Sequence, residues 1–451
     1  MNTHNITVQG GASVRLPTAG KYCDRDIVVT AEDGKIPDEY IIPSGTLDIS
    51  ENGEHDVKEY ASVNVIVASG GGAPVEEKDV NFYDYDGELL YSYTIAEAQA
   101  LTELPPAPTP KKDFLVFDEW NWTLAQIKDY NNCLQIGAVY KTIDGKTYAI
   151  IKIDEEWQKN VTLRYCQWCS SVVVDWGDGN VEAPTTTGNG TNVTKQHTYA
   201  EVGTYTITVQ ANGTWNLGLN NVSNPFIGDA SLQNGAVILR ECYIGNGARI
   251  FSGAFSKARR LEKITIPKTA TQTWSQPFTN CASLQCVIFP STFTKIEAQS
   301  FEYCNALKVC SLSPNITTIG YNAFSGAIFN TLSVPQPTTV LAVGQSAAKK
   351  VIIPENGLTS IGGLCFYQTF SLTNFTVPET VTSIAANAFF RCYSLLKLKF
   401  LPTIPPTVAN ANAFSEIPTT CVVEVPEGTL AAYQAAANYS SIAAQMVESE
   451  S

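Results

Sequence analysis

The chain has 451 residues, of which 44% are hydrophobic and 16% are charged. This balance excludes a disordered chain and favours a folded, β-rich protein, and the length predicts two to four domains. The formal net charge of −14 is uneven, since residues 1–239 hold 15 Lys and Arg against 32 Asp and Glu, while residues 240–451 hold 14 against 11. Neither half has a basic stripe, so nucleic acid is excluded as a partner.

Neither end of the sequence carries a familiar targeting signal. The start, MNTHNITVQGGASVRLP, lacks the charged and then apolar order of a signal peptide. The sequence contains no run of about 18 apolar residues, which is the length needed to cross a bilayer. The last residues, QMVESES, carry no lipidation motif. We therefore expect a protein made in a cytoplasm, without membrane insertion and not exported by itself.

The sequence of the first 160 residues predicts small β modules. Residues 1–67 form two of them, with alternating apolar positions and a hairpin signal at Asn52-Gly53, and residues 68–79 are a Gly-rich linker. Residues 80–160 open with a hairpin through Asp86-Gly87, pass through a proline-rich stretch and a helix in TLAQIKDYNN, and end with a hairpin through Asp144-Gly145.

Residues 161–236 are predicted to form a small β-sandwich. VVVDWGDGN is a buried strand that runs into a tight acidic turn, and GTYTITVQ places alternate apolar side chains on one face of a strand.

Residues 237–426 repeat themselves with a period near 23, which is the sequence signature of a solenoid. Strands end in a proline in each coil, and a phenylalanine recurs in phase with them. The prolines are Pro267, Pro290, Pro314, Pro335, Pro354, Pro378, Pro402 and Pro426, and the phenylalanines are Phe255, Phe278, Phe301, Phe324, Phe366, Phe389 and Phe414. The Ala-rich residues 427–451 are predicted to be a helical cap and tail.

The twelve cysteines raise the question of disulfides or metal. Three positions after the first six of these phenylalanines the residues are Ala258, Cys281, Cys304, Ala327, Thr369 and Cys392. A column that accepts Ala, Cys and Thr indicates a size requirement, so we predict packing, with an occasional disulfide between coils as the alternative. A metal or redox site would rest on Cys166 and Cys169, but a zinc ribbon needs a second such pair, and none follows.

No catalytic, cofactor or metal site is predicted. Asp175 and Asp178 in DWGDG could form a carboxylate pair or a Ca²⁺ site, but turn formation explains them as well, and calcium loops supply more oxygens. His197 is expected to bond to backbone within the sandwich. The acidic residues of the repeats are sparse and unphased, which disfavours glycoside hydrolysis. We therefore do not expect an enzyme.

Several segments resemble known families. SIAANAFFRCYSLLKLKFLP and TIGYNAFSGA resemble the BspA-type leucine-rich repeats over about residues 240–430, with one divergent coil at 336–354. VVVDWGDG, His197, Tyr199 and Gly203-Thr204-Tyr205 resemble a PKD-like sandwich, and VNFYDYDGELLYSYT resembles β-grasp-like repeats of bacterial surface proteins. LPTAGKYCDRDIVVTA and PSGTLDISENGEHDVKEYASVNVIV look like front segments of phage tail and baseplate proteins, which implies virion attachment.

A candidate ligand-binding surface lies in the last two full coils. The positions one and four after the phenylalanine vary, as solvent-facing positions do, and both become aromatic there: Tyr367, Phe370, Phe390 and Tyr393. Exposed, they would form a platform for sugar rings or a protein, whereas the alternative is packing under the C-terminal helix or a neighbouring subunit.

These features predict a mainly β, non-catalytic phage virion protein of the tail-fibre or receptor-binding type. The N-terminal modules would join other virion proteins, and the repeats would bind a host cell-surface glycan or protein. A homo-oligomer is a further expectation, and many copies on one virion would multiply the affinity. The alternative is a bacterial cell-surface adhesin with leucine-rich repeats, located on the cell surface rather than the virion.

Overall fold

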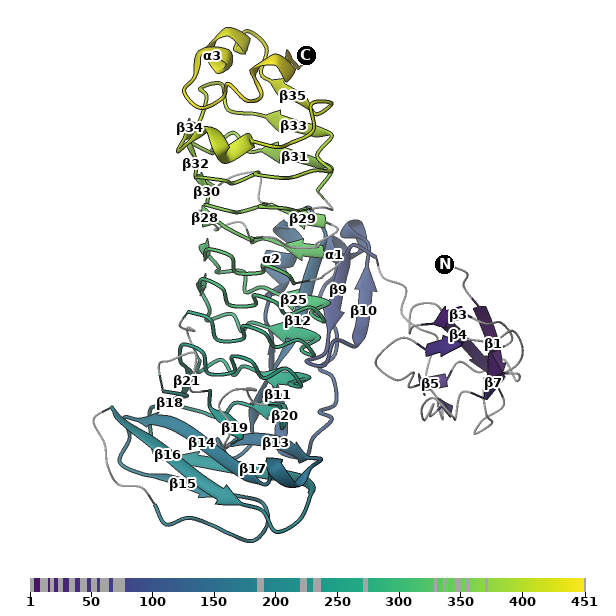
Figure 1. The fold of residues 1–451 in the computed structure, drawn as a ribbon, viewed down its shortest axis with the longest axis vertical. Helices are drawn as coiled ribbons and strands as arrows, with labels where there is room; N and C mark the ends of the chain where they lie inside the picture. The colour runs from purple at the N-terminus through teal and green to yellow at the C-terminus, as the bar shows by residue number, and fades with distance from the viewer. Residues whose placement is uncertain are drawn as a thin grey trace. The chain divides into compact units, whose positions relative to one another are not determined.

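The computed structural model describes eight short strands within the first 77 residues, and then residues 78–184, 190–219, 225–229, 237–270, 275–327, 331–335, 338, 340–344, 350–353, 357–369 and 372–449. The chain divides into two compact units, residues 1–74 and 75–451. Within the described residues the protein is mainly β, as the sequence predicts (Figure 1).

The first unit is built from pairs of short strands. They are β1 (His4–Val8), β2 (Arg15–Leu16), β3 (Gly20–Tyr22), β4 (Ile27–Ala31), β5 (Pro37–Tyr40), β6 (Leu47–Ile49), β7 (His55–Asp56) and β8 (Val65–Val67). β1 pairs with β4 in parallel, while β2–β7, β3–β6 and β5–β8 are antiparallel. The strands beside Asn52-Gly53, β6 and β7, thus pair with other strands, and the predicted turn itself lies outside the described residues.

The second unit opens with a four-stranded sheet in the order β10-β9-β12-β11. Its elements are β9 (Val80–Tyr83), β10 (Leu89–Tyr93), α1 (Ile95–Ala100), β11 (Leu115–Trp120), α2 (Leu124–Asp129) and β12 (Leu134–Thr142). β9 and β10 are antiparallel around Asp86-Gly87, which confirms that hairpin. The helix predicted in TLAQIKDYNN is α2, which begins with a capping box between Thr123 and Gln126.

The hairpin predicted at Asp144-Gly145 is wrong, although the turn forms with Gly145 at φ 74°. β12 pairs with β9 and β11, whereas β13 (Thr147–Ile153) pairs with β17 and β20. Both edges of each strand are therefore already occupied, and the turn passes the chain from one sheet to the next.

Two sheets then form a sandwich whose inner side chains share one core with the repeats. One sheet has the order β15-β17-β13-β20-β22, and the other β16-β14-β18-β21, with β19 beside β14. The strands are β14 (Asn160–Gln167), β15 (Val172–Asp175), β16 (Thr191–Thr198), β17 (Gly203–Ala211), β18 (Trp215–Leu217), β19 (Ile227–Asp229), β20 (Leu239–Tyr243), β21 (Ala248–Ile250) and β22 (Lys263–Thr265). β13 and β20 lie outside residues 161–236 and yet complete this sandwich; the predicted domain boundaries stay a prediction.

The repeats continue from β20 and β22 as a stack of parallel coils (Figure 1). Longer strands line one side: β23 (Cys286–Ile288), β25 (Val309–Ser311), β27 (Thr331–Ser333), β29 (Lys350–Ile352), β31 (Asn374–Val377), β33 (Lys397–Phe400) and β35 (Val422–Val425). A six-stranded parallel sheet of two-residue strands lines another: β24 (Lys295–Ile296), β26 (Thr318–Ile319), β28 (Val340–Leu341), β30 (Ser360–Ile361), β32 (Ser383–Ile384) and β34 (Thr407–Val408). The predicted solenoid is thereby confirmed.

The repeat phenylalanines stack inside the coils. Successive rings lie 5.2–5.8 Å apart between centroids and are nearly parallel, in one run from Phe255 to Phe324 and another from Phe366 to Phe414. This spacing follows the distance of about 4.8 Å between neighbouring strands, so each ring covers the next.

The C-terminal cap closes the last coil. It consists of α3 (Leu430–Ala435), a 3₁₀ turn at Ala443–Gln445 and β36 (Met446–Glu448), which pairs with β35 in parallel. Tyr433 and Tyr439 are fully buried against Phe400, and their hydroxyls donate to the carbonyls of Pro402 and Pro406.

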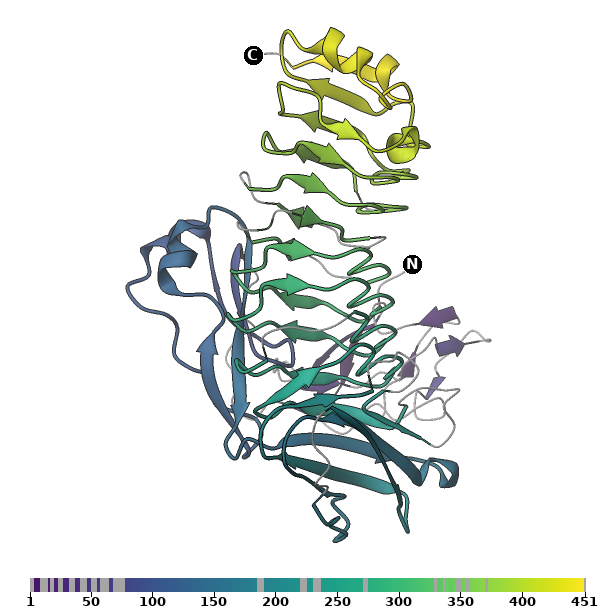
Figure 2. The same ribbon diagram turned by 90° about the vertical axis from the view of Figure 1, so that its left-hand side faces the viewer.

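The sheet of residues 80–142 lies against the outer face of the longer strands (Figure 2). Ile136 of β12 shares a buried cluster with Cys286, Ile288 and Val309, which point outward from β23 and β25. Asn121 donates to the carbonyl of Phe289 and to Ser311, each over 2.9 Å. The outer face of the early coils is therefore closed by the chain itself.

Candidate binding surface

One side of the repeat array, here called the turn edge, is formed by the turns that lead from each short strand to the next longer strand. Each turn carries the repeat phenylalanine, and the residues two before and two after it adopt a left-handed backbone in every turn except at Asn412, which lies in a 3₁₀ helix that ends at Phe414; where they are not glycine, φ lies between 51° and 62°. The non-glycine residues are Gln276, Gln299, Asn322, Leu364 and Asn387 before it, and Lys257, Asn280, Tyr303, Gln368, Arg391 and Glu416 after it. Such a conformation is uncommon outside glycine and costs about 1 kcal/mol or more at each residue.

A ladder of backbone hydrogen bonds along the array holds these turns in place. In each of these bonds the donor is the amide of the residue two positions after a repeat phenylalanine. The acceptor is the carbonyl of the residue directly after the phenylalanine of the following coil, at 2.7–3.1 Å. Examples are the bonds from Lys257 to Thr279, from Tyr303 to Ser325 and from Arg391 to Ser415. The ladder ties the turns of Phe255, Phe278, Phe301, Phe366 and Phe389 each to the following turn, so the side chains on these turns project from fixed backbone positions.

The cysteine column lies just beneath this edge. The thiols of Cys281, Cys304 and Cys392 are fully buried, and each lies 2.9–3.1 Å from the carbonyl oxygen of the phenylalanine one coil earlier. Burial raises the pKa of Cys392 to about 12, which keeps it a thiol. All eleven cysteines among the described residues are unbridged, so packing explains the column.

The structure places three of the four predicted ligand-binding residues, while Phe370 lies outside the described residues. Tyr367 and Phe390 lie beside each other, as the alignment predicts, with ring centroids 5.7 Å apart and planes at 23°. The guanidinium carbon of Arg391 lies 4.9 Å from the centroid of Phe390. The rings are thus stacked along the array rather than laid flat as a platform.

Tyr393 is the most exposed of the three predicted residues that the structure describes, at 47%. Its hydroxyl lies 3.2 Å from Glu416, which also forms an ion pair with Arg391 at 3.1 Å. A hydrogen bond to Glu416 is the main cause that raises the pKa of Arg391 above its ordinary value. The C-terminal helix therefore does not cover this residue.

The expectation that the position directly after the phenylalanine faces solvent is wrong. Ser256, Thr279 and Ser325 are buried there, and Tyr367 and Phe390 are only half-buried. Thr279 shows the reason, because its hydroxyl donates to the carbonyl of Gln299 in the next coil. Aromatic rings are too large for that position, so they extend outward and stack on one another.

Two exposed tyrosines on the turn edge were not predicted. Tyr303 is 51% exposed and lies two residues after its phenylalanine, and Tyr321 is 47% exposed and lies three residues before Phe324. The ring of Tyr303 lies over Gly326, where a side chain would collide with it. An alignment of these further columns of the turn would have found both.

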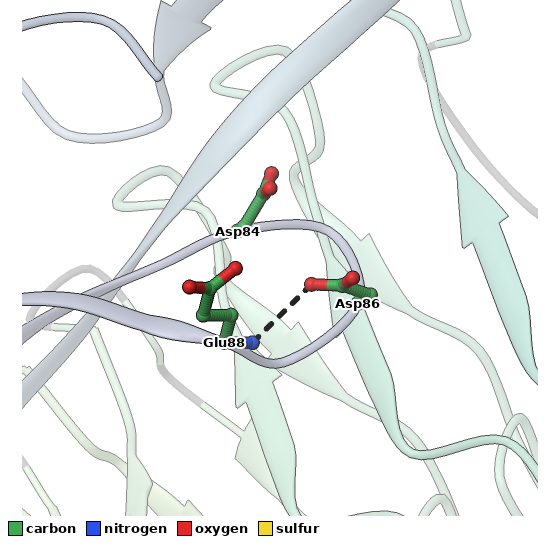
Figure 3. A group of neighbouring side chains, drawn as sticks. All are labelled: Asp84, Asp86 and Glu88. Carbon is green, nitrogen blue, oxygen red and sulfur yellow. Dashed lines mark hydrogen bonds between the residues drawn. The ribbon is translucent and has the colours of Figure 1, made fainter. Parts of the chain in front are cut away.

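One group of acidic side chains within the described ranges could hold a cation: Asp84, Asp86 and Glu88 in the hairpin between β9 and β10 (Figure 3). The ammonium of Lys111 already lies among them, 3.3 Å, 2.7 Å and 2.6 Å from their oxygens. Burial lowers the pKa of Lys111, but the hydrogen bonds to Asp86 and Glu88 outweigh it and raise the pKa well above its ordinary value. Lysine thus supplies the positive charge that this group needs.

The acidic turn of the sandwich is explained by local hydrogen bonds. Asp175 accepts from the amide of Gly177 and Asp178 from that of Asn180. His197 does not bond to backbone as expected; its Nε2 lies 2.7 Å from Asp178, and its ring stacks on Trp176. These contacts build and brace the turn.

Comparison with known proteins agrees with the repeat geometry. Residues 227–347 and 344–443 match the BspA type leucine rich repeat region, in six copies. This part of the chain is therefore similar to the BspA-type repeats. No curated protein matches the chain.

Three solved structures are similar to the BspA-type region. They are a leucine-rich repeat protein from Bacteroides ovatus (17% identity, 43% of this chain and 69% of that one, TM-score 0.23), a leucine rich cell surface protein from Faecalibacterium prausnitzii (17%, 46% and 78%, 0.22) and the pneumococcal vaccine antigen PcpA (13%, 48% and 80%, 0.20). The PKD-like, β-grasp-like and phage-type resemblances of the front half stay predictions. In the part of the chain that the structure describes, no helix has the length and apolarity to cross a bilayer.

Proposed function

We propose that this protein is a non-catalytic attachment protein whose BspA-type repeats bind a partner at a bacterial cell surface, as an adhesin does. The observation that carries the proposal is the turn edge, where exposed tyrosines project from turns that backbone hydrogen bonds tie to the neighbouring coil. Such rigid, repeated positions suit recognition, because little conformational entropy is lost on binding.

The closed outer face of the early coils supports this choice of surface. Residues 80–142 cover β23 and β25, so a partner meets those coils at the turn edge or at the sheet of two-residue strands. The virion role predicted from the sequence draws on the resemblance of residues 1–67 to phage tail and baseplate proteins. It stays a prediction, as do the attachment to other virion proteins and the homo-oligomer.

The test is saturable binding of the labelled full chain to bacterial and animal cells, with heat-unfolded protein as the control. We expect the folded chain to bind with a plateau that unlabelled protein competes away. Equal retention of folded and unfolded protein on every cell type would reject an attachment function.

A further inference from the structure

One large aromatic side chain of the β-sandwich, Trp168, is exposed although its neighbours are buried. It begins the turn between β14 and β15 (Figure 1), and 55% of its surface is open to solvent, while Cys166 and Cys169 beside it are buried. Tryptophan is mostly buried in folded proteins, so an indole that is open to this extent needs an explanation.

The ring of Trp168 is held with one face on the backbone of Gly190. A Cβ atom on Gly190 would lie 3.1, 2.7 and 2.9 Å from three consecutive ring atoms, Cε2, Cζ2 and Cη2. These distances are nearly equal, so the glycine faces the plane of the ring, since an approach along the edge would bring one atom much closer than its neighbours. The amide of Gly190 also donates to the carbonyl of Gln167 over 2.9 Å, which fixes the two strands at this point. The surface that Trp168 exposes is therefore its opposite face.

We infer that Trp168 and the polar side chains around it form a carbohydrate-binding site, in which a neutral pyranose stacks on the open face of the indole. A pyranose with equatorial hydroxyls presents C–H groups on its faces, which pack on an aromatic ring, and hydroxyls at its rim, which need hydrogen-bond partners. Trp168 lies in the sandwich and outside the turn edge, so this site does not depend on the proposed function.

The surroundings of the ring supply such hydrogen-bond partners. Asn192 of β16 is exposed and pairs with Cys166 of β14, which places it on the same sheet face as Trp168. Asn212 is exposed at the neighbouring turn, where its side chain donates to the hydroxyl of Ser170 over 3.3 Å. An amide side chain both donates and accepts hydrogen bonds, as the hydroxyls of a sugar do.

The charges around the ring favour a neutral sugar over an acidic one. The segments that meet at this end of the sandwich, 165–174, 190–194 and 208–217, contain no Asp, Glu, Lys or Arg. By the strand register, two charged residues share this sheet face among the described strands: Arg164 is buried, and Arg249 lies on β21, two strands from β14. A carboxylated or sulfated sugar would lose hydration of its charge without gaining an ion pair at the ring.

The experiment titrates the full chain with two neutral β-linked sugars, cellotetraose and N-acetylated chitotetraose, by calorimetry. Trp168→Ala removes the stacking face, whereas Trp168→Phe keeps an aromatic ring beside Gly190. Trp157→Ala is the matched control, because Trp157 is 46% exposed but lies at the opposite end of β14, where its Nε1 donates to Glu155.

We expect the native chain to bind at least one of the two sugars saturably, and Trp168→Ala to lose about tenfold or more in affinity. Trp168→Phe should lose less, and Trp157→Ala should bind as the native chain does. In the native chain, the bound sugar should also shield Trp168 from quenching of its fluorescence by acrylamide, a readout that needs no folded variant.

No binding of either sugar at concentrations up to about 10 mM would overturn the carbohydrate site. Native affinity in Trp168→Ala, or an equal loss in Trp157→Ala, would overturn the role of Trp168. The cell-binding assay of the proposed function is read separately, so failure of this site and failure of the attachment function are distinguishable.

Discussion

The interpretation of the cysteine column predicts a specific order of stabilities for two neighbouring substitutions, Cys392→Ala and Phe389→Ala. Cys392→Ala removes one buried sulfur, comparable to a methylene at about 0.8 kcal/mol, and a thiol hydrogen bond to the carbonyl of Phe366 of about 0.5 kcal/mol. The expected loss is therefore about 1–1.5 kcal/mol. Phe389→Ala removes a ring stacked between Phe366 and Phe414, for which large cavities cost about 3–5 kcal/mol.

Urea denaturation followed by circular dichroism would measure both changes. Because a solenoid coil contacts mainly its neighbours, hydrogen exchange should localise both effects to the coils on either side. A thiol reagent at pH 8 should react slowly with Cys392 in the folded chain, since burial raises the pKa of that thiol to about 12. A Cys392→Ala variant as unstable as Phe389→Ala, or rapid labelling of the native thiol, would refute the packing explanation.

Three further predictions follow from charge and packing. Lys111→Met should destabilise the chain by roughly 1–3 kcal/mol in urea, because it leaves carboxylates unpaired, one of them buried; Lys128→Met, away from this group, is the control. Burial raises the pKa of Asp178, but the hydrogen bonds from His197 and Asn180 together outweigh it and the net pKa is lowered. The contribution of Asp178 to stability is therefore present above the unfolded pKa and is lost as pH falls through the folded one. His197→Gln should move that loss to higher pH in an acid titration, and an unchanged midpoint would contradict the pairing. Gly137→Val should release residues 80–142 from Ile288, because a side chain there would collide with it, and limited proteolysis should then cut this segment faster than in the native chain.

Much of the repeat region could be predicted, because the sequence of each coil is enough to show where its strand and its turn lie. Each coil repeats its phenylalanine and proline at nearly the same interval, and stacking forces equivalent residues into columns, so an alignment of the coils yields the register of Cys392 and the neighbouring positions of Tyr367 and Phe390. The exposure of those columns was harder to predict, because it depends on how a side chain such as Thr279 bonds to the next coil.

The docking of residues 80–142 was missed because it joins segments about 150–200 residues apart in sequence. A signal for it exists in the repeats. Outward positions of β23 and β25 hold Cys286, Ile288 and Val309, where later coils have Asn374 and Lys397. Apolar residues on a face expected to meet water indicate a covering element. The prediction of a hairpin at Asp144-Gly145 is wrong for a similar reason. The local sequence indicates a turn, but it does not reveal which distant strands will pair with the strands on either side of it.

In the part of the chain that the structure describes, the sheet of residues 80–142 contacts the early coils but not the late ones, so the number of coils should be fixed in the first group and free to change in the second. Coils from β23 to β27 are tied to the segment between α2 and β12 by hydrogen bonds such as Tyr130 to Val334 and Ser333 to Cys133, so an inserted coil there would shift those partners by about 4.8 Å. Coils from β31 to β35 touch only their neighbours and the cap among the contacts described. Duplication or loss of whole coils should therefore be tolerated between β31 and the cap, which gives the protein a way to vary its reach while its base stays fixed.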